Sequence, residues 1–170
     1  LTELTIPAGV TSIGTGAFNG CTALTDIYYD GTLANWETIN KSTTGSAVIH
    51  YTNIGSGTCG VNLTWLLNDD GVLTISGSGE MKDYGYSKEN APWYPWRERV
   101  LTVVFPETLS YIGSYAFRDC TKLTSITVPA SVARISSNAF SGCSGMTDVY
   151  YDGSLKDWNA VNRGAISGAV

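Results

Sequence analysis

The chain has 170 residues, with 10 Lys and Arg against 15 Asp and Glu, which gives a formal net charge of −5 at pH 7. Only 15% of the residues are charged and no basic run occurs, so nucleic acid and anionic membrane surfaces are disfavoured as partners. No apolar stretch approaches the roughly 20 residues that a membrane-spanning helix needs. The 19 Gly, 10 Tyr and 5 Trp favour a turn-rich, β-rich fold.

The chain begins with a sequence frame that recurs later. The frame is Leu-Thr-x-Ile-x-x-Pro-x-x-Val-x-x-Ile-Gly-x-x-Ala-Phe-x-x-Cys, and it spans residues 1–21, residues 123–143 and, in part, residues 103–120. Its Phe residues at 117 and 140 are 140 − 117 = 23 positions apart. A period of this size predicts a solenoid, in which each repeat buries its apolar side by stacking on a neighbour.

Each frame predicts a short strand followed by one turn of helix. The alternation of Leu4 with Ile6, and of Ile126 with Val128, indicates strands with one buried face. The prolines of the frame fit strand ends, where no ladder donor is needed: Pro7, Pro106 and Pro129. A hydroxyl residue before each Ala-Phe is expected to cap a helical turn that carries Phe and Cys into the core: Thr15, Ser114 and Ser137.

A longer repeat, with a period of 123 − 1 = 122, contains the short one. Residues 1–48 align without gaps on residues 123–170, and 22 of the 48 positions are identical. Each copy continues through Tyr-Tyr-Asp-Gly into a short amphipathic helix, capped by Thr32 or Ser154. The chain starts and stops at the same phase of this unit, so we expect it to be a slice of a longer tandem protein.

The middle of the chain predicts a different module. Residues 52–60 are expected to link the two long units, because they are rich in Gly, Ser and Thr. Two apolar runs around Asn68–Gly71 predict a β-hairpin, and residues 77–91 are expected to form a loop. Trp93, Trp96 and Val100 then predict another short helix. The expected organisation, in chain order, is 1–51, 52–60, 61–100 and 101–170.

Four cysteines occur, three of them after Ala-Phe in the repeat frame and one, Cys59, in the Gly-rich stretch. Equivalent side chains on neighbouring repeats point in parallel, which favours a ladder of reduced, buried thiols. A disulfide between Cys120 and Cys143 is the alternative, since neighbouring rungs lie within disulfide reach.

No catalytic, cofactor or metal motif stands out. Gly55-x-Gly57-x-x-Gly60 matches a dinucleotide pattern, but phosphate binding requires a helix to begin there, and the sequence predicts that a strand follows instead. His50 is the single histidine and has no evident partner. No carboxylate pair is selected by spacing, and no Cys or His spacing fits zinc. We therefore predict no catalytic, cofactor-binding or metal-binding residue.

The strongest functional signal is a run of aromatic residues within thirteen positions. Exposed rings of this kind can stack on sugars or anchor protein partners. The alternative is that they pack the predicted helix onto the end of a repeat. The candidate binding surface consists of Tyr84, Tyr86, Trp93, Tyr94 and Trp96.

The repeated frames resemble the BspA-type leucine-rich repeats of bacterial surface proteins. The resemblance rests on Ile112–Phe117 with Cys120 and on the copies that begin at Ile13 and Ile135, although Ser136 and Met146 replace the usual Gly and Leu. It implies an α/β leucine-rich-repeat solenoid with short strands, single-turn helices and an inserted β-hairpin.

The same resemblance implies a bacterial protein that is extracellular or attached to the cell wall. The expected role is non-enzymatic binding or adhesion to a host or bacterial surface protein or glycan, without nucleic acid or membrane insertion. Two alternatives are a structural spacer that displays another domain and, less favoured, a fragment of a carbohydrate-active enzyme.

Overall fold

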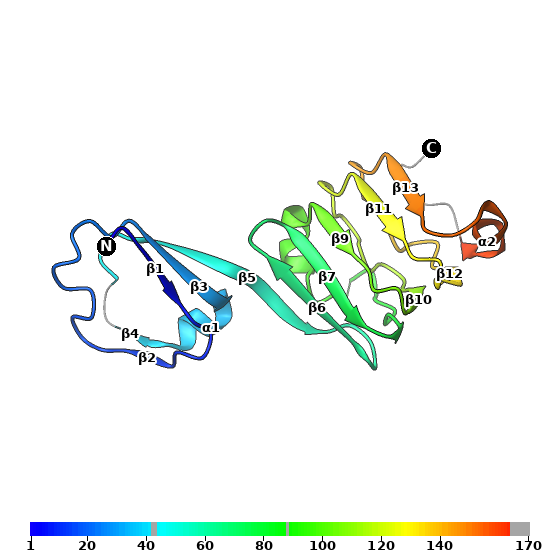
Figure 1. Cartoon of the computed structure of the whole chain (residues 1–170). Helices are drawn as coiled ribbons and strands as arrows, with labels where there is room; N and C mark the ends of the chain where they lie inside the picture. The colour runs from blue at the N-terminus through cyan, green and yellow to red at the C-terminus, as the bar shows by residue number, and fades with distance from the viewer. Residues whose placement is uncertain (42–43, 88, 164–170) are drawn as a thin grey trace. The chain divides into compact units, whose positions relative to one another are not determined.

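A computed structural model describes residues 1–41, 44–87 and 89–163 (Figure 1). The chain divides into two compact units, Leu1–Ser56 (unit 1) and Gly57–Val170 (unit 2). Each unit contains one copy of the long repeat. The end of the second copy, residues 164–170, lies outside the described residues, as do residues 42, 43 and 88.

Unit 1 is built on parallel strands in the order β1-β3-β5, with a second pair β2-β4. The elements are β1 (Glu3–Ile6), β2 (Ser12–Ile13), β3 (Asp26–Thr32), α1 (Leu33–Thr38), β4 (Asn40–Lys41) and β5 (Val48–Thr58). Inward side chains of these strands and of α1 form one core: Ile6, Leu24, Ile27, Tyr29, Trp36 and Ile39. The alternating burial along β1 and β3 agrees with the strand pattern of the sequence.

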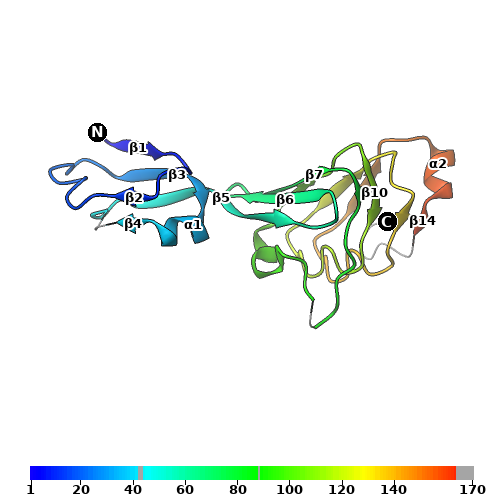
Figure 2. The same ribbon diagram turned by 90° about the horizontal axis from the view of Figure 1, so that it is seen from below.

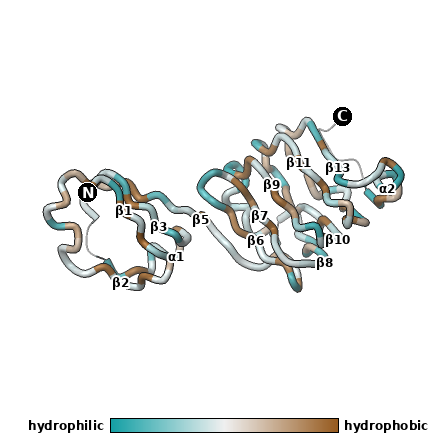
Figure 3. The backbone as a smooth tube through the Cα atoms, in the orientation of Figure 1, coloured by the Kyte–Doolittle hydropathy of each residue, from teal (hydrophilic) through white to brown (hydrophobic). Residues whose placement is uncertain are grey.

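Unit 2 begins with an antiparallel hairpin, β6 (Leu63–Asn68) and β7 (Val72–Gly77), which confirms the predicted hairpin and its Asn68–Gly71 turn. Strand β9 (Thr102–Val104) continues beside β7 in parallel, and β11 (Ser125–Val128) pairs with β13 (Asp148–Tyr151). Figure 1 shows β7, β9, β11 and β13 in a row, and Figure 3 shows hydrophobic stretches on them.

A second sheet in unit 2 has the order β14-β12-β10-β8 (Figure 2 labels β10 and β14). Its strands are β8 (Gly79–Glu80), β10 (Leu109–Ile112), β12 (Arg134–Ile135) and β14 (Asn162–Arg163), and α2 (Leu155–Ala160) precedes the last of them. Each repeat of unit 2 therefore contributes one strand to this second sheet and one strand to the row of β9, β11 and β13 on the other side. The core between them includes Leu109, Phe117, Leu123 and Ile126, all nearly inaccessible to solvent.

The Tyr-Tyr-Asp-Gly segment has the same structure in both copies. The second tyrosine turns inward and donates its hydroxyl to a backbone carbonyl, Tyr29 to Ala8 and Tyr151 to Ala130, each at 3.3 Å. A Cβ at Gly31 or Gly153 would lie 2.4 Å from that tyrosine ring. The glycine is therefore required because the ring lies against its backbone.

The two predicted helix caps are confirmed. The Thr32 hydroxyl accepts a hydrogen bond from the Asn35 N–H, and Ser154 forms a capping box with Asp157. The structure adds a cation at the other end of each helix. Lys41 donates to the Trp36 carbonyl at 2.6 Å and Arg163 to the Trp158 carbonyl at 2.8 Å, each lying over the indole ring as well.

The Ala-Phe-x-x-Cys segments are not the predicted single helical turns. They are successive tight turns, with backbone hydrogen bonds such as Cys143 N–H to the Phe140 carbonyl at 3.1 Å and Ser141 N–H to the Asn138 carbonyl at 3.2 Å. Left-handed residues such as Gly20 and Gly142 interrupt them, and a right-handed helix cannot continue through such residues. The turns still carry Phe117 and Phe140 into the core, as the frame predicts.

Three expectations for the middle of the chain need correction. The expected linker 52–60 contains the boundary between the two units, but its residues 52–58 form the second half of strand β5, in which Ile54 is buried. The expected loop 77–91 contains β8, which pairs with β10. The helix near Trp93 is a 3-10 segment, Tyr94–Arg99, with Pro95 near its start and non-helical dihedrals at Trp96.

All four cysteines are free thiols, with Cys59, Cys120 and Cys143 buried and Cys21 half-buried. This agrees with the prediction of reduced thiols rather than with a disulfide between Cys120 and Cys143. Among the described residues, no helix is long and apolar enough to cross a membrane.

Candidate functional site

Two residues of the candidate aromatic surface are core residues instead. Trp93 is only 1% exposed and stacks on Phe117 with ring centroids 5.7 Å apart, and Phe117 stacks in turn on Phe140 at 5.2 Å. Trp93 thus adds one more ring to the stack that Phe117 and Phe140 form in the repeats. Tyr84 packs edge-on against Trp93 and is also buried. The Trp93 ring is therefore covered by the stack of repeat residues, whereas Tyr84 packs against it at the edge of the pocket described below.

Trp96 has an intermediate position. It is half-buried and its ring lies 6.3 Å from that of Trp65, which in turn contacts Trp93. The buried indole N–H of Trp65 finds no acceptor within the described part of the chain. Gly57 lies against this ring, since a Cβ there would be 3.0 Å from the indole nitrogen. The Trp96 side chain therefore mainly closes the end of the unit 2 core.

The two remaining residues of the run, Tyr86 and Tyr94, meet around a buried arginine. The guanidinium of Arg118 lies 4.8 Å from the Tyr86 ring and 4.2 Å from the Tyr94 ring. It donates to the Tyr86 carbonyl and, at 3.2 Å, to a carboxylate oxygen of Asp119. The Tyr94 hydroxyl donates to the same oxygen at 3.1 Å, and Tyr115 packs edge-on against Tyr86. We call these five residues the tyrosine–arginine cluster.

The cluster arises where one repeat departs from the others. Tyr115, Arg118 and Asp119 occupy the positions that Gly16, Asn19 and Gly20 hold in the first copy of the frame. Comparing the three copies position by position would have revealed these residues from the sequence, whereas the aromatic run alone did not.

The departure carries a conformational cost. Tyr115 and Asp119 have φ of 53° and 58°, the left-handed region, which costs about 1–2 kcal/mol per non-glycine residue. Such strain persists where the surroundings fix the conformation, and it concentrates at functional sites. Here the Asp119 N–H donates to the Ser141 carbonyl at 2.9 Å, which holds the strained turn.

The electrostatics of the cluster keep the arginine charged. Burial of Arg118 opposes its charge, but the neighbouring oxygens of Tyr94 and Asp119 outweigh that effect and raise the pKa of Arg118. Tyr86 nevertheless remains 70% exposed above the guanidinium. Arg97 stacks on Tyr94 at 4.5 Å and adds a second cation. The result is a surface on which aromatic rings and cations lie against one another.

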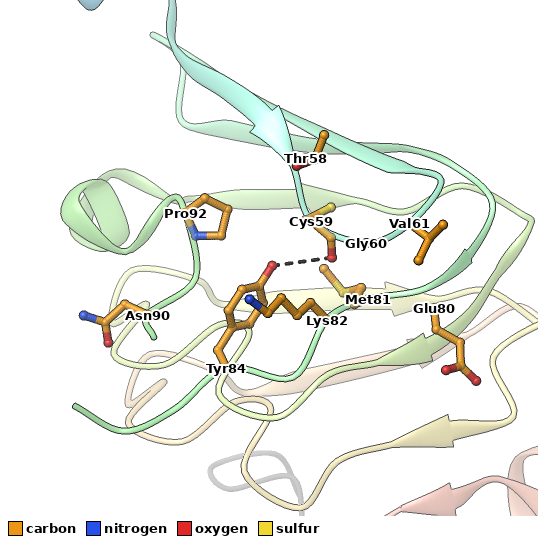
Figure 4. Close-up of a pocket in the computed structure, with 10 residues that line it drawn as sticks. All are labelled: Thr58, Cys59, Gly60, Val61, Glu80, Met81, Lys82, Tyr84, Asn90 and Pro92. Carbon is orange, nitrogen blue, oxygen red and sulfur yellow. Dashed lines mark hydrogen bonds between the residues drawn. The ribbon is translucent and has the colours of Figure 1, made fainter. Parts of the chain in front are cut away.

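Unit 2 also contains a pocket of about 580 Å³ (Figure 4). Its floor is formed by Cys59, Met81 and Tyr84, and charged or polar side chains stand at its rim: Thr58, Glu80, Lys82 and Asn90. The Tyr84 hydroxyl donates to the Cys59 carbonyl at 3.4 Å. Burial raises the pKa of the Cys59 thiol to about 12 and also raises the pKa of Tyr84. Neither group is therefore a nucleophile at neutral pH.

His50, the single histidine, has a partner that the sequence did not indicate. Its Nε2 lies 2.7 Å from the Asp26 carboxylate, and its ring stacks on Tyr28 at 4.7 Å. The hydrogen bond from His50 lowers the pKa of Asp26. This arrangement joins neighbouring strands β3 and β5 and does not include a nucleophile.

Asp83 in unit 2 is likewise a structural carboxylate. It accepts hydrogen bonds from the Ser114 N–H at 2.8 Å and the Tyr111 hydroxyl at 2.6 Å, which lower its pKa. Arg134 lies over the Tyr111 ring at 3.9 Å. Across the described ranges, no three His, Cys, Asp or Glu residues come together as a metal site.

Comparison with known proteins shows which proteins share this architecture. No curated protein sequence matches the chain. A solved structure, a leucine-rich repeat protein from Eubacterium ventriosum ATCC 27560, is 32% identical over 65% of this chain, with a TM-score of 0.53. The match covers 28% of that protein, so the chain spans about a quarter of its length.

A second solved structure is a leucine rich cell surface protein from Faecalibacterium prausnitzii A2-165. The match covers 95% of this chain and 62% of that protein. Its identity is 17% and its TM-score 0.30, too low to support an argument. Residues 1–56 and 96–160 match the BspA type leucine rich repeat region, in six copies. The chain therefore belongs to the BspA-type leucine-rich repeat family.

Proposed function

We propose that this chain is a non-enzymatic binding module of a bacterial surface or secreted protein, built as a slice of a solenoid. Membership of the BspA-type family supports this proposal. The partner is a protein, or a glycan displayed on one, at the surface of a host or bacterial cell. The tyrosine–arginine cluster is the contact surface.

The observation that carries the proposal is the exposed Tyr86 ring held on the buried Arg118 guanidinium. Tyrosine, tryptophan and arginine dominate the energetics of protein interfaces, because they bury much area with little loss of side-chain freedom. Arg118 is fixed by Asp119 and by both rings, so little conformational entropy remains to be lost on binding. The strained backbone at Tyr115 and Asp119 supports the same assignment.

The experiment is a screen of the whole chain against arrayed surface proteins and glycans, with each hit remeasured on variants. Tyr86→Ala should weaken a genuine hit at least about tenfold, the loss of a typical hot-spot residue. Leu155→Ala is the control, since Leu155 is an apolar residue of unit 2 as exposed as Tyr86 but lies on α2. Equal binding by both variants would contradict the proposed surface. Absence of any hit would favour the spacer alternative.

A further inference from the structure

The walls of the unit 2 pocket are joined by hydrogen bonds. One wall is the chain that follows β5, and the other is β8 with the residues after it. Gly60 and Met81 form an isolated antiparallel bridge, and a Cβ at Gly60 would overlap the Glu80 carbonyl oxygen. The Lys82 N–H donates to the Cys59 carbonyl at 2.8 Å. These contacts fix the shape of the pocket without a ligand, as in most small-ligand sites.

The hydrogen-bonding groups at the floor of the pocket are largely occupied. The Cys59 carbonyl accepts from the Lys82 N–H and from the Tyr84 hydroxyl. The backbone N–H groups of Cys59, Met81 and Tyr84 donate to carbonyls elsewhere in unit 2, which belong to Leu63, Tyr111 and Ser114. A polar group buried without a partner loses free energy, and this floor offers few partners. It therefore favours an apolar group.

The same floor favours an aromatic ring over an aliphatic chain. Cys59 and Met81 bring two sulfur atoms to it, and each residue is only 2% exposed. Sulfur makes favourable contacts with aromatic rings, and the flexible methionine side chain adapts to the shape of an occupant. Tyr84 adds a ring of its own, which packs edge-on against Trp93. A further ring can pack against Tyr84 in the same way.

The rim of the pocket indicates that neutral groups lie next to that ring. The charged residues of the lining are Glu80 and Lys82, one of each sign. The Lys82 ammonium lies 3.7 Å from the Glu89 carboxylate, so its charge is already offset and attracts an anionic ligand little. Thr58 and Asn90 are exposed at the rim, and their hydroxyl and amide groups can bond a peptide backbone.

Val61 extends the apolar lining to the mouth of the pocket. It is 97% exposed and adjoins Gly60 in the wall. Figure 4 shows Val61 on one side of the floor and Pro92 on the other. A side chain that enters between them covers Val61, and removal of that apolar area from water stabilises the complex.

We propose that this pocket binds an aromatic side chain of a partner protein, with the ring on the floor and the neighbouring peptide amides at Thr58 and Asn90. A ring that fills a pocket is a common form of anchor residue at protein interfaces. The volume of about 580 Å³ lies within the range of pockets that bind small molecules. The proposal does not depend on the tyrosine–arginine cluster, because no residue belongs to both sites.

The two methionines of the chain allow a test in the whole protein. Met81 lines the pocket, whereas Met146 is buried and does not line it. With isotope-labelled methionine methyl groups, N-acetyl-phenylalaninamide should shift the nuclear magnetic resonance signal of Met81 saturably, with a Kd of about 1 mM for a ligand of this size. The Met146 signal should not move. Absence of a saturable shift at Met81, or an equal shift at Met146, would overturn the proposal.

Matched ligands test the chemistry of the occupant. N-acetyl-leucinamide keeps both amides but has no ring, and it should bind about threefold more weakly. Free phenylalanine keeps the ring but carries two charges next to it, and it should also bind more weakly. Equal or tighter binding of the leucine ligand would exclude a preference for rings. Equal or tighter binding of free phenylalanine would make the ligand an amino acid and not a protein side chain.

Val61→Ser tests where the ligand lies. It should weaken binding of N-acetyl-phenylalaninamide about threefold, because the ligand loses apolar contact at the mouth, while an exposed valine contributes little to folding. Val104→Ser is the matched control, since Val104 is an exposed valine of β9 that does not line the pocket. Equal binding by the two variants would overturn the proposal. A Met81 signal that shifts with protein concentration alone would make a second copy of this chain the occupant, contrary to the proposal.

Discussion

The indole ring of Trp93 stacks on the phenyl ring of Phe117 at an interplanar angle of 26°, and its N–H donates to the Ala116 carbonyl at 2.8 Å. Trp93 comes from residues 61–100, the segment inserted between the two long repeats, whereas Phe117 belongs to the repeat frame. The insert therefore begins the stack of aromatic rings on which the repeats of unit 2 are built.

This contact predicts a graded loss of stability. Trp93→Ala should lower the free energy of unfolding by about 3–5 kcal/mol, because it opens a large cavity beside Phe117. Trp93→Phe should cost less, about 1–3 kcal/mol, because it keeps a ring but leaves the buried Ala116 carbonyl without its donor. Urea unfolding followed by far-ultraviolet circular dichroism measures both. Equal losses would show that stacking on Phe117 contributes little.

The glycine of Tyr-Tyr-Asp-Gly supplies a second prediction. Gly31→Ala and Gly153→Ala should each destabilise the protein by about 1–3 kcal/mol, since the new methyl group would overlap a tyrosine ring. The loss should be larger at Gly31, because Tyr29 is fully buried and cannot move as Tyr151 can.

Gly9→Ala is the control for both glycine substitutions. A Cβ at Gly9 meets no atom within 4 Å, so the change should stay within about 0.5 kcal/mol. Thermal unfolding of the three variants ranks them. A loss at Gly9 as large as at Gly31 would mean that backbone freedom, and not the tyrosine ring, sets the requirement.

A third prediction concerns acid stability. The Ser114 N–H and the Tyr111 hydroxyl lower the pKa of Asp83, so its carboxylate stabilises the folded state above the unfolded pKa of about 4. That contribution is lost as pH falls through the lower folded pKa. Asp83→Asn should therefore cost roughly 0.5–1 kcal/mol at pH 7, given solvent screening, and progressively less below pH 4.

Urea midpoints of wild type and Asp83→Asn between pH 7 and pH 2.5 test this dependence. Asp152→Asn, a change of an exposed turn residue in the same unit, should have little effect on stability at pH 7. A difference between wild type and Asp83→Asn that grows on acidification would contradict the predicted sign.

The thiols should differ in reactivity. Burial raises the pKa of Cys120 and raises that of Cys143 to about 12, and the Cys143 thiol donates to the Phe117 carbonyl at 2.9 Å. The half-buried Cys21 should therefore react first with iodoacetamide in the native chain, and Cys59, Cys120 and Cys143 only after unfolding. Mass spectrometry counts the labels. A two-dalton gain on reduction would instead reveal a disulfide.

Several local features were predictable from the sequence because they depend on neighbouring residues. The hairpin around Asn68–Gly71 follows from turn residues between alternating apolar runs, and the Ser154 cap follows from Asp157 three residues later. The prediction of a helical turn at each Ala-Phe-x-x-Cys segment was wrong, because the repeat pattern does not reveal the left-handed residues that interrupt these segments. The predicted linker, residues 52–60, does contain the boundary between the two units, but its composition did not reveal that residues 52–58 belong to strand β5.

The candidate site was only partly predictable. The sequence located the aromatic run but not which rings are exposed, because that depends on residues far along the chain. Tyr86 and Arg118, 32 positions apart, meet only after the insert has packed against the repeats. The histidine shows the same limitation, since Asp26 reaches His50 only across the β3–β5 ladder.

The sequence by itself determined the repeat period, the family and the core positions of the frame, since a repeated apolar pattern must bury the same residues in every copy. The tertiary structure alone decided how the insert divides its aromatic residues, with Trp93 and Tyr84 in the core and Tyr86 exposed on Arg118. It also decided that β3 lies between β1 and β5, whereas among the described residues β13 pairs with β11 alone. Identical residues differ there because burial depends on which strand lies beside them.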